Sequence, residues 1–215
     1  MSEIITLDEN CRSIHFLCER DKRFAKLFSM IGEITYTTHG DGYAFLLHEI
    51  IEQMLSIKSG QAIYNRLCNY CNNDITPQII ASLSDEKLRS TGMSGSKVLY
   101  IQSITQNIIE GSLRLDILSE MPDIEAIKYL TQFKGIGTWT AKMYLIFVLN
   151  RQDVLPYEDG AFLQAYRWLY KTDDTSKKSV EKKCKKWKPY SSIAARYMYR
   201  ALDNGLTKSE FHLFK

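Results

Sequence analysis

The sequence predicts an all-α fold, on three observations. Helical periodicity runs through most of the 215 residues, no stretch alternates as a sheet strand does, and only four prolines and eleven glycines interrupt the pattern. Apolar side chains recur at helical spacing in residues 44–57, 97–109, 160–170 and 191–202. We therefore expect about ten helices packed by ridges and grooves.

Individual helices are marked by their starts. Ser84 and Ser94 are followed by residues typical of a helix N-terminus, and Pro122 precedes two acids that fit a first turn. The apolar run YLIFVL at residues 144–149 has the composition of a buried strand. It continues from residues 138–141 without a turn signal, so we interpret it as a buried helix.

Charge is distributed unevenly along the chain. Residues 167–200 hold eleven Lys and Arg against three Asp and Glu, a local balance of +8 in a chain whose net charge is +3, so the remainder carries −5. A basic segment on an otherwise acidic chain indicates a polyanionic partner, and a solvated lysine-rich helix face is the alternative.

The remaining composition favours a cytoplasmic protein, or a nuclear one in a eukaryote. No apolar run approaches the ~20 residues that span a membrane, and the N-terminus lacks the features of a secretory signal. Five irregularly spaced cysteines argue against a disulfide framework. Cys68 and Cys71 form a CxxC, but no second ligand pair suggests zinc and no strand precedes it, so two reduced helix cysteines are expected.

The most informative segment is LTQFKGIGTWTAK at residues 130–142. It predicts a helix ending near Phe133, a tight turn through Gly135 and Gly137, and a new helix beginning near Thr138. Glycines tolerate positive φ and let a phosphate approach the main-chain N–H groups of a helix N-terminus. Ile136 would plug the turn into the core. An ordinary αα-hairpin with glycines at its corner is the alternative.

Four motifs in order resemble the helix-hairpin-helix DNA glycosylase superfamily, and its 3-methyladenine DNA glycosylase II family in particular. They are FKGIGTWTA at residues 133–141, DVLPYED at 153–159, WKPYSSIAARYMY at 187–199 and IEQMLS at 51–56. The second motif ends twenty residues after Trp139, which is the family's spacing to its catalytic aspartate.

The resemblance implies that Asp159 is the catalytic residue, with Glu158 and Asp153 as local alternatives. Asp159 precedes the predicted helix at residues 160–170, so we expect it at a helix N-terminus, where the dipole favours the carboxylate. Cleavage of an N-glycosidic bond passes through an oxocarbenium-like sugar, which a carboxylate stabilises while it orients water.

An alkylated purine carries positive charge and leaves without a general acid, so an aromatic pocket can select it by stacking and cation–π attraction. The family nominates Trp139 and Tyr199 for this pocket. Tyr157 and Tyr197 are further candidates, and core packing is the alternative for all four.

The resemblance also implies the DNA contacts. Met54 occupies the position of the family's wedge leucine, in a turn region near Gln53 to Ser56. The wedge is an apolar side chain that fills the gap left by an extruded base; a place in the core of helix 44–57 is the alternative for Met54. The full predicted set of DNA-binding residues is Lys134, Gly135, Ile136, Gly137, Thr138, Lys142, Met54, Gln53 and Ser56. The main-chain oxygens of Thr131, Phe133 and Ile136 match those that bind a monovalent cation, Na+ or K+, in relatives.

Departures from the family pattern refine the expectation. Lys134 replaces a common proline. Cys184 is the one cysteine in the C-terminal region where some members carry four, so no iron–sulfur cluster is expected. Trp139 stands where bifunctional relatives have a nucleophilic lysine, which implies a monofunctional hydrolase without lyase activity.

The sequence thus predicts a single helix-hairpin-helix domain over residues 1–215, with two helical lobes flanking a cleft. Lobe A spans about 44–145 with the hairpin at 130–142, and lobe B about 1–43 plus 146–215. We expect a monomeric glycosylase acting on alkylated purines, such as 3-methyladenine or 7-methylguanine, in double-stranded DNA during base excision repair. A non-catalytic DNA-binding module and a helical protein-interaction scaffold are the alternatives.

Overall fold

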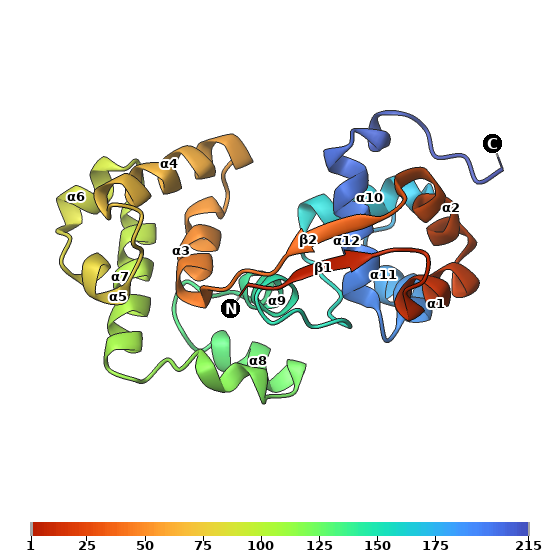
Figure 1. Cartoon of the computed structure of the whole chain (residues 1–215). Coiled ribbons are helices and arrows are strands. Elements are labelled where there is room, and N and C mark those ends of the chain that lie inside the picture. Colours follow the sequence, from red (N-terminus) through yellow and green to blue (C-terminus); the bar gives the residue numbers. More distant parts are fainter. Residues whose placement is uncertain (1, 215) are drawn as a thin grey trace. The chain divides into compact units, whose positions relative to one another are not determined.

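The computed structural model describes residues 2–214 and confirms a mostly helical fold (Figure 1). The chain divides into two compact units. The first unit holds residues 39–144, and the second holds residues 2–38 together with the chain from Leu145 onward. The division falls within helix α9 (Thr138–Phe147). Because α9 extends to Phe147, the apolar run at residues 144–149 begins as a helix, as predicted, and not as a strand.

The first unit is built around α7 (Gly95–Ile109), whose buried face includes Ile101 and Ile104. Helix α7 packs against α3, α5 and α6. The helices of this unit besides α7 are α3 (Gly42–Glu52), α4 (Ile57–Tyr70), α5 (Pro77–Ala81), α6 (Asp85–Ser90), α8 (Asp123–Leu130) and the first part of α9. A short 3-10 turn, Asp116–Ser119, precedes α8.

The predicted helix starts in this unit are confirmed. Ser84 caps α6 by accepting a hydrogen bond from Lys87 N–H, and Ser94 caps α7 in the same way from Lys97 N–H. Pro122 is the cap position of α8, whose first turn contains two acids that complement the helix dipole.

The helix predicted over residues 44–57 is too long. Helix α3 ends at Glu52, and Ser56 caps a separate helix, α4, by accepting from Ser59 N–H at 3.2 Å. A serine hydroxyl readily accepts hydrogen bonds from the N–H groups of the turn that follows it. It therefore favours the start of a new helix over continuation of the preceding one. Residues 53–56 are therefore a turn, as the family resemblance implied.

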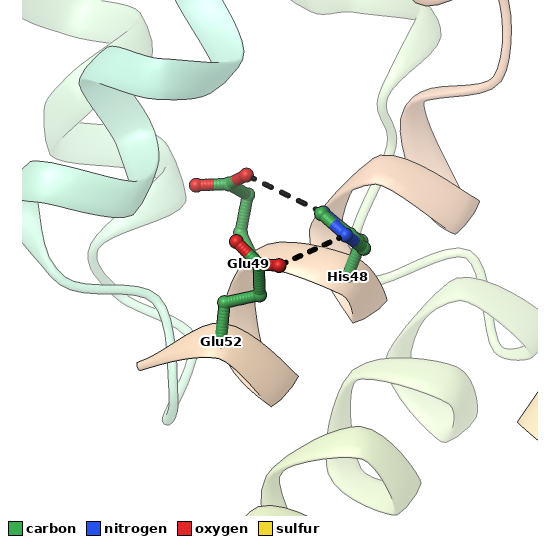
Figure 2. A group of neighbouring side chains, drawn as sticks. All are labelled: His48, Glu49 and Glu52. Atoms are coloured by element: carbon green, nitrogen blue, oxygen red, sulfur yellow. Dashed lines mark ion pairs between the residues drawn. The ribbon is translucent and has the colours of Figure 1, made fainter. Parts of the chain in front are cut away.

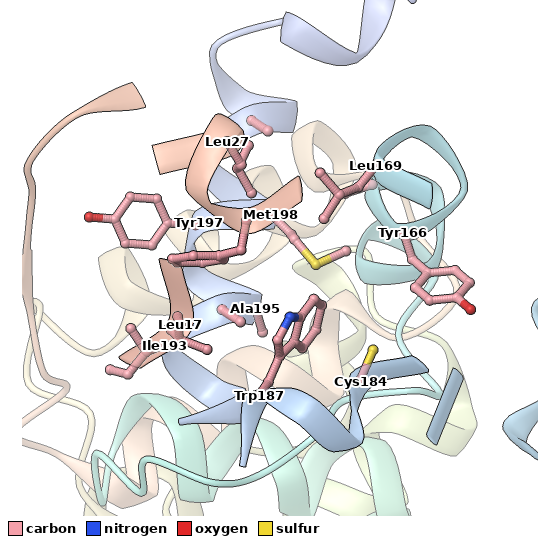
Figure 3. Packing of buried hydrophobic residues seen from close by; sticks show 14 of the residues in the cluster. Leu17, Leu27, Tyr166, Leu169, Cys184, Trp187, Ile193, Ala195, Tyr197 and Met198 are labelled. Atoms are coloured by element: carbon pink, nitrogen blue, oxygen red, sulfur yellow. The ribbon is translucent and has the colours of Figure 1, made fainter. Parts of the chain in front are cut away.

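The second unit surrounds α12 (Ser191–Asp203), which packs against α2 and α10. Figure 3 shows Trp187, Tyr197 and Met198 among the side chains of this core, all of them almost completely buried. The other helices of the unit are α1 (Arg12–Arg20), α2 (Lys22–Ile31), α10 (Gly160–Tyr170) and α11 (Lys177–Cys184), with 3-10 turns at Lys185–Trp187 and Leu206–Lys208.

A two-stranded antiparallel sheet in the second unit was not predicted. Strand β1 (Ile4–Leu7) pairs with β2 (Ile34–Thr37) in a register that sets Ile4 opposite Thr37. Each strand has four residues, too short to show alternation, although β-branched residues are frequent in both. No helix among residues 2–214 is long and apolar enough to cross a membrane.

A buried carboxylate connects three elements of the second unit. Asp21 is 2 % exposed, and its Oδ2 accepts from Tyr170 O–H at 2.5 Å and Trp187 Nε1–H at 2.9 Å. The Lys186 ammonium lies 3.0 Å from the same oxygen, and Asp21 also caps α2 through Arg23 N–H. Burial alone raises the pKa of this carboxyl, but these hydrogen bonds and Lys186 outweigh it and lower the pKa below its ordinary 3.8.

Replacing Asp21 with asparagine is expected to lower the free energy of unfolding by about 1.5–3 kcal/mol, the range for hydrogen bonds to a charged group. The depressed pKa means that the carboxylate's contribution is present above pH 3.8 and is lost as the pH falls through the lower folded-state value. Urea unfolding of both proteins at pH 7 and at successively lower pH measures the effect. A difference in unfolding free energy between the two proteins that stays constant with falling pH would contradict this prediction.

Candidate functional site

The hairpin between α8 and α9 has the predicted tight turn, and its first helix ends earlier than expected, at Leu130. Gly135 has φ +100°, in the region that favours glycine, and a Cβ there would lie 2.6 Å from Tyr100 Cβ. Both facts require glycine at this position. Ile136 is 3 % exposed and plugs the turn into the core, as predicted.

The hairpin exposes a helix N-terminus for an anion. The first backbone bond of α9 runs from Ala141 N–H to Gly137 O at 2.9 Å, so the preceding N–H groups lie before the helical ladder. Among the described residues, no heavy atom lies within 4 Å of a Cβ built at Gly137, so this side of the turn is open. The N–H of Ile136 instead donates to Phe133 O at 3.0 Å, so Ile136 anchors the turn and does not supply that group to a ligand.

Gln53 connects the turn after α3 to the hairpin. Its Nε2 donates to Gly135 O at 3.0 Å and to Thr140 Oγ1 at 3.1 Å. Gln53, predicted as a DNA-binding residue, therefore has one structural partner in the glycine turn and one in α9. Ser56, predicted in the same group, uses its hydroxyl to cap α4.

Met54 lies at the tip of the turn. Its side chain is 101 % exposed and its φ is +60°, so the alternative of a core position in helix 44–57 is wrong. Leu55 and Ile57 are also exposed. An exposed apolar cluster of this kind indicates a surface that contacts a partner.

Two predicted lysines differ in accessibility. Lys134 is exposed beside Gly135, as a phosphate contact would require. Lys142 is 7 % exposed, so the residue offers little surface to DNA, and its prediction as a DNA contact is not supported. This lysine lies in a stretch of α9, residues 140–146, in which every residue is buried.

Asp159 is the N-cap residue of α10, as predicted. Its Oδ1 accepts from Phe162 N–H at 2.6 Å, and the residue is 9 % exposed. The N-cap position places this carboxyl group beside the N–H groups and the positive dipole end of α10. Its local alternatives are Glu158, which is partly exposed, and Asp153.

Asp153 has a structural task. Its Oδ1 accepts from the Ser191 hydroxyl at 2.5 Å, and the Lys188 ammonium lies 3.7 Å from Oδ2. The neighbouring residue Val154 donates its N–H to Ser192 Oγ at 2.9 Å. The motif at 153–159 is thus bonded to the start of α12, in the motif at 187–199, and this fixes the segment that carries Asp159.

The four aromatic candidates for the base pocket lie in different environments. Trp139 and Tyr199 are partly buried, and the Tyr199 ring lies 6.1 Å from that of Phe147. Tyr157 is partly buried, but the Lys177 ammonium covers one face of its ring at 4.9 Å.

Tyr197 requires a correction. It is fully buried in the core of the second unit, and its hydroxyl donates to Leu7 O and Gly32 O at 3.2 Å each (Figure 3). Its ring packs against Phe24 and Phe28, so it presents no surface on which a base could stack. Core packing, the alternative interpretation, holds for this residue.

In the basic segment at residues 167–200, some lysines pack against aromatic rings and others are exposed to solvent. Lys183 and Lys186 lie over the Tyr170 ring at 5.3 and 5.1 Å. The other lysines of the segment are exposed, and these are Lys171, Lys177, Lys178, Lys182, Lys185 and Lys188. This exposed set keeps the predicted potential for polyanion binding.

The three hairpin carbonyls predicted to bind a monovalent cation accept few hydrogen bonds. Among the described residues, none donates a hydrogen bond to the main-chain oxygens of Thr131 or Ile136. The oxygen of Phe133 accepts one bond, from Ile136 N–H, and retains a second lone pair. Neutral carbonyl oxygens of this kind fit Na+ or K+ better than a transition metal.

A second cluster of metal-ligating types lies on α3, where His48 meets two glutamates (Figure 2). Glu49 Oε1 lies 3.7 Å from His48 Nδ1, and Glu52 Oε1 lies 3.3 Å from Nε2. One ligand atom of each residue lies within 4.8 Å of the others, but each carboxylate is paired with a different ring nitrogen of His48. Hydrogen bonding to Glu49 raises the pKa of His48, which favours an imidazolium ion-paired on both edges.

A family model confirms what these elements are. Residues 47–189, two thirds of the chain, match the model of the HhH-GPD superfamily base excision DNA repair proteins. The chain belongs to the HhH-GPD superfamily. The matched range contains the turn at 53–56, the glycine hairpin and Asp159.

Individual HhH-GPD proteins are similar over nearly the whole chain. DNA-3-methyladenine glycosylase 1 of Schizosaccharomyces pombe is 33% identical over 188 residues, covering 86% of this chain and 82% of that protein. The crystal structure of a DNA-3-methyladenine glycosidase from Bacillus halodurans has a TM-score of 0.84 and 29% identity, with 97% of both chains covered. A 3-methyladenine DNA glycosylase from S. pombe, in complex with abasic DNA, has a TM-score of 0.80 and 29% identity, covering 90% of this chain and 97% of that one. Family and relatives identify this HhH-GPD protein as a DNA glycosylase of base excision repair.

Proposed function

We propose that this HhH-GPD protein hydrolyses the N-glycosidic bond of alkylated purines in double-stranded DNA, with 3-methyladenine and 7-methylguanine as its lesion class. The observation that carries the proposal is Asp159, a nearly buried carboxylate held at the N-terminus of α10 within the family-matched range. Sequence similarity to proteins named DNA-3-methyladenine glycosylase supports the lesion class.

In the proposed reaction, the glycine hairpin anchors a backbone phosphate through main-chain N–H groups, without reading sequence. Met54 fills the gap left by the extruded nucleotide, which offsets part of the few kcal/mol that unstacking costs. Trp139 and Tyr199 supply aromatic surface for the cationic base.

Asp159 then stabilises the oxocarbenium-like sugar as the C–N bond breaks, and it orients or deprotonates the water that attacks the anomeric carbon. The bond electrons leave with the purine, whose positive charge they neutralise, so no general acid is needed. Trp139 stands at the position of the lysine nucleophile of lyases, and this supports a monofunctional course. A monovalent cation at Thr131, Phe133 and Ile136 would strengthen the hairpin's hold on a phosphate. We expect a monomer to be sufficient.

Chromatography of bases released from alkylated duplex DNA tests the proposal. We expect free 3-methyladenine and 7-methylguanine, and a DNA backbone that stays unbroken until alkali is added. Immediate strand cleavage would contradict the monofunctional course. Salt-dependent DNA binding without release of any base would instead support the non-catalytic module.

A further inference from the structure

The C-terminal end of α3 is held by a lysine from another helix. The Lys97 ammonium of α7 donates to Ile51 O at 2.6 Å and to Gln53 O at 2.7 Å. Carbonyls at the end of a helix lack helical partners, and a cation is favourable there because of the helix dipole. Lys97 thus satisfies two oxygens at the position where α3 stops.

This lysine is committed to the main chain. Among residues 2–214, the ion pairs do not include Lys97, and its side chain is partly buried. Burial lowers the pKa of its ammonium. A lysine that serves only solubility would stay in water, so this placement indicates a specific task.

What Lys97 holds is the turn that carries Met54. Met54 follows Gln53 directly, and its left-handed φ of +60° is unfavourable for a residue with a Cβ. Ser56 fixes the other end of the turn as the cap of α4. The exposed apolar tip is therefore held at both ends, in a conformation that a free loop would rarely adopt.

The same helix α7 also contacts the hairpin. Tyr100, one turn beyond Lys97, is the side chain that excludes a Cβ at Gly135. Gln53 completes the arrangement, because its amide bonds to Gly135 O and Thr140 Oγ1. Each of the three elements, the turn at 53–56, the hairpin and α7, thus contacts the other two.

We propose that Lys97 is a positioning residue for base extrusion, which fixes the turn at 53–56 against the hairpin so that Met54 is in place before DNA binds. The inference rests on the proposed function, in which Met54 enters the base stack. Pre-organisation removes the entropy that ordering the turn would otherwise cost during binding. Lys97 would act through Met54 without touching DNA.

The test uses Lys97→Met, which keeps the length of the side chain and removes its donors. The probe is a duplex with a tetrahydrofuran abasic analogue next to 2-aminopurine, whose fluorescence rises when it is unstacked. We expect wild-type protein to raise the fluorescence signal and Lys97→Met to lower the amplitude of this rise. The base-release rate of Lys97→Met should be roughly ten- to a hundredfold lower than that of wild type. Lys87→Met, on α6, is the matched control and should behave as wild type.

Salt dependence separates positioning from a direct phosphate contact. If Lys97 only positions the turn, the slope of log affinity against log salt stays the same in Lys97→Met. A loss of about one unit of slope, the value for one phosphate contact, would overturn the proposal. Hydrogen exchange at residues 54–56 should become faster in the variant. If Lys97→Met does not fold, Lys97→Gln, which keeps one donor, takes its place in every measurement.

A double-mutant cycle shows whether the two residues act together. We expect Met54→Ala to lower the fluorescence signal, and Lys97→Met to add nothing further in that background. Additive losses, or a signal that Met54→Ala leaves unchanged, would overturn the proposal. The fluorescence assay needs no catalysis. A wild-type protein that releases no base would therefore contradict the proposed function, while the fluorescence assay would still test the role of Lys97.

Discussion

Asp159→Asn is expected to lower the single-turnover rate of base release by about 10²–10³-fold, the usual cost of removing one charge-stabilising group from an active site. Asparagine is nearly isosteric and keeps an oxygen to accept the Phe162 N–H bond. Because asparagine and aspartate are equally good N-caps, the free energy of unfolding should change by less than about 0.5 kcal/mol. The variant should therefore fold and bind abasic DNA as wild type does.

Glu158→Gln is the matched control for this experiment, since it neutralises the neighbouring acid in the same segment. We expect its base-release rate to stay close to that of wild type. Rates on alkylated duplex, thermal unfolding and affinity for abasic DNA are measured for both variants. If Glu158→Gln were inactive and Asp159→Asn active, the assignment of the catalytic residue would be wrong.

Much of the helical framework could be predicted because local chemistry determines it. Ser84 and Ser94 cap helices where the sequence places caps, and Asp159 caps α10. The glycine turn was also predictable, since positive φ at Gly135 restricts the residue type. These features depend on a few neighbouring residues, so a single sequence contains the information.

Features that depend on distant contacts could not be predicted. The strand at Ile4–Leu7 exists because it pairs with residues 34–37, and four residues show no period. Helical periodicity misses the end of α3 at Glu52, which only the family resemblance indicated, because this end is stabilised by Lys97, 44 residues beyond Gln53. Burial of Lys142 and Tyr197 likewise results from packing. Residue type and motif position made both look accessible, whereas tertiary context decides which face of a helix is covered.

Gly135→Ala is expected to reduce the free energy of unfolding by about 2–4 kcal/mol, since it combines backbone strain at positive φ with overpacking. The added methyl group would lie 2.6 Å from Tyr100 Cβ, and φ is +100°. Neither conflict can be relieved without moving the hairpin away from α7. Because Gln53 bonds to Gly135 O, we expect the turn at 53–56 to lose order as well. Urea unfolding and hydrogen exchange measure the two effects.

Gly137→Ala separates phosphate binding from folding at a position two residues away. A Cβ at 137 meets no described atom within 4 Å, and Gly137 is not among the glycines with positive φ, so the unfolding free energy should stay the same or rise slightly. The methyl group would nevertheless stand where a phosphate must approach the N–H groups before α9. We expect a loss of about 1.5–3 kcal/mol in DNA-binding free energy, the value of a hydrogen bond to a charged group. Unchanged affinity in a stable Gly137→Ala protein would mean that the open side of the glycine turn does not contact the DNA backbone.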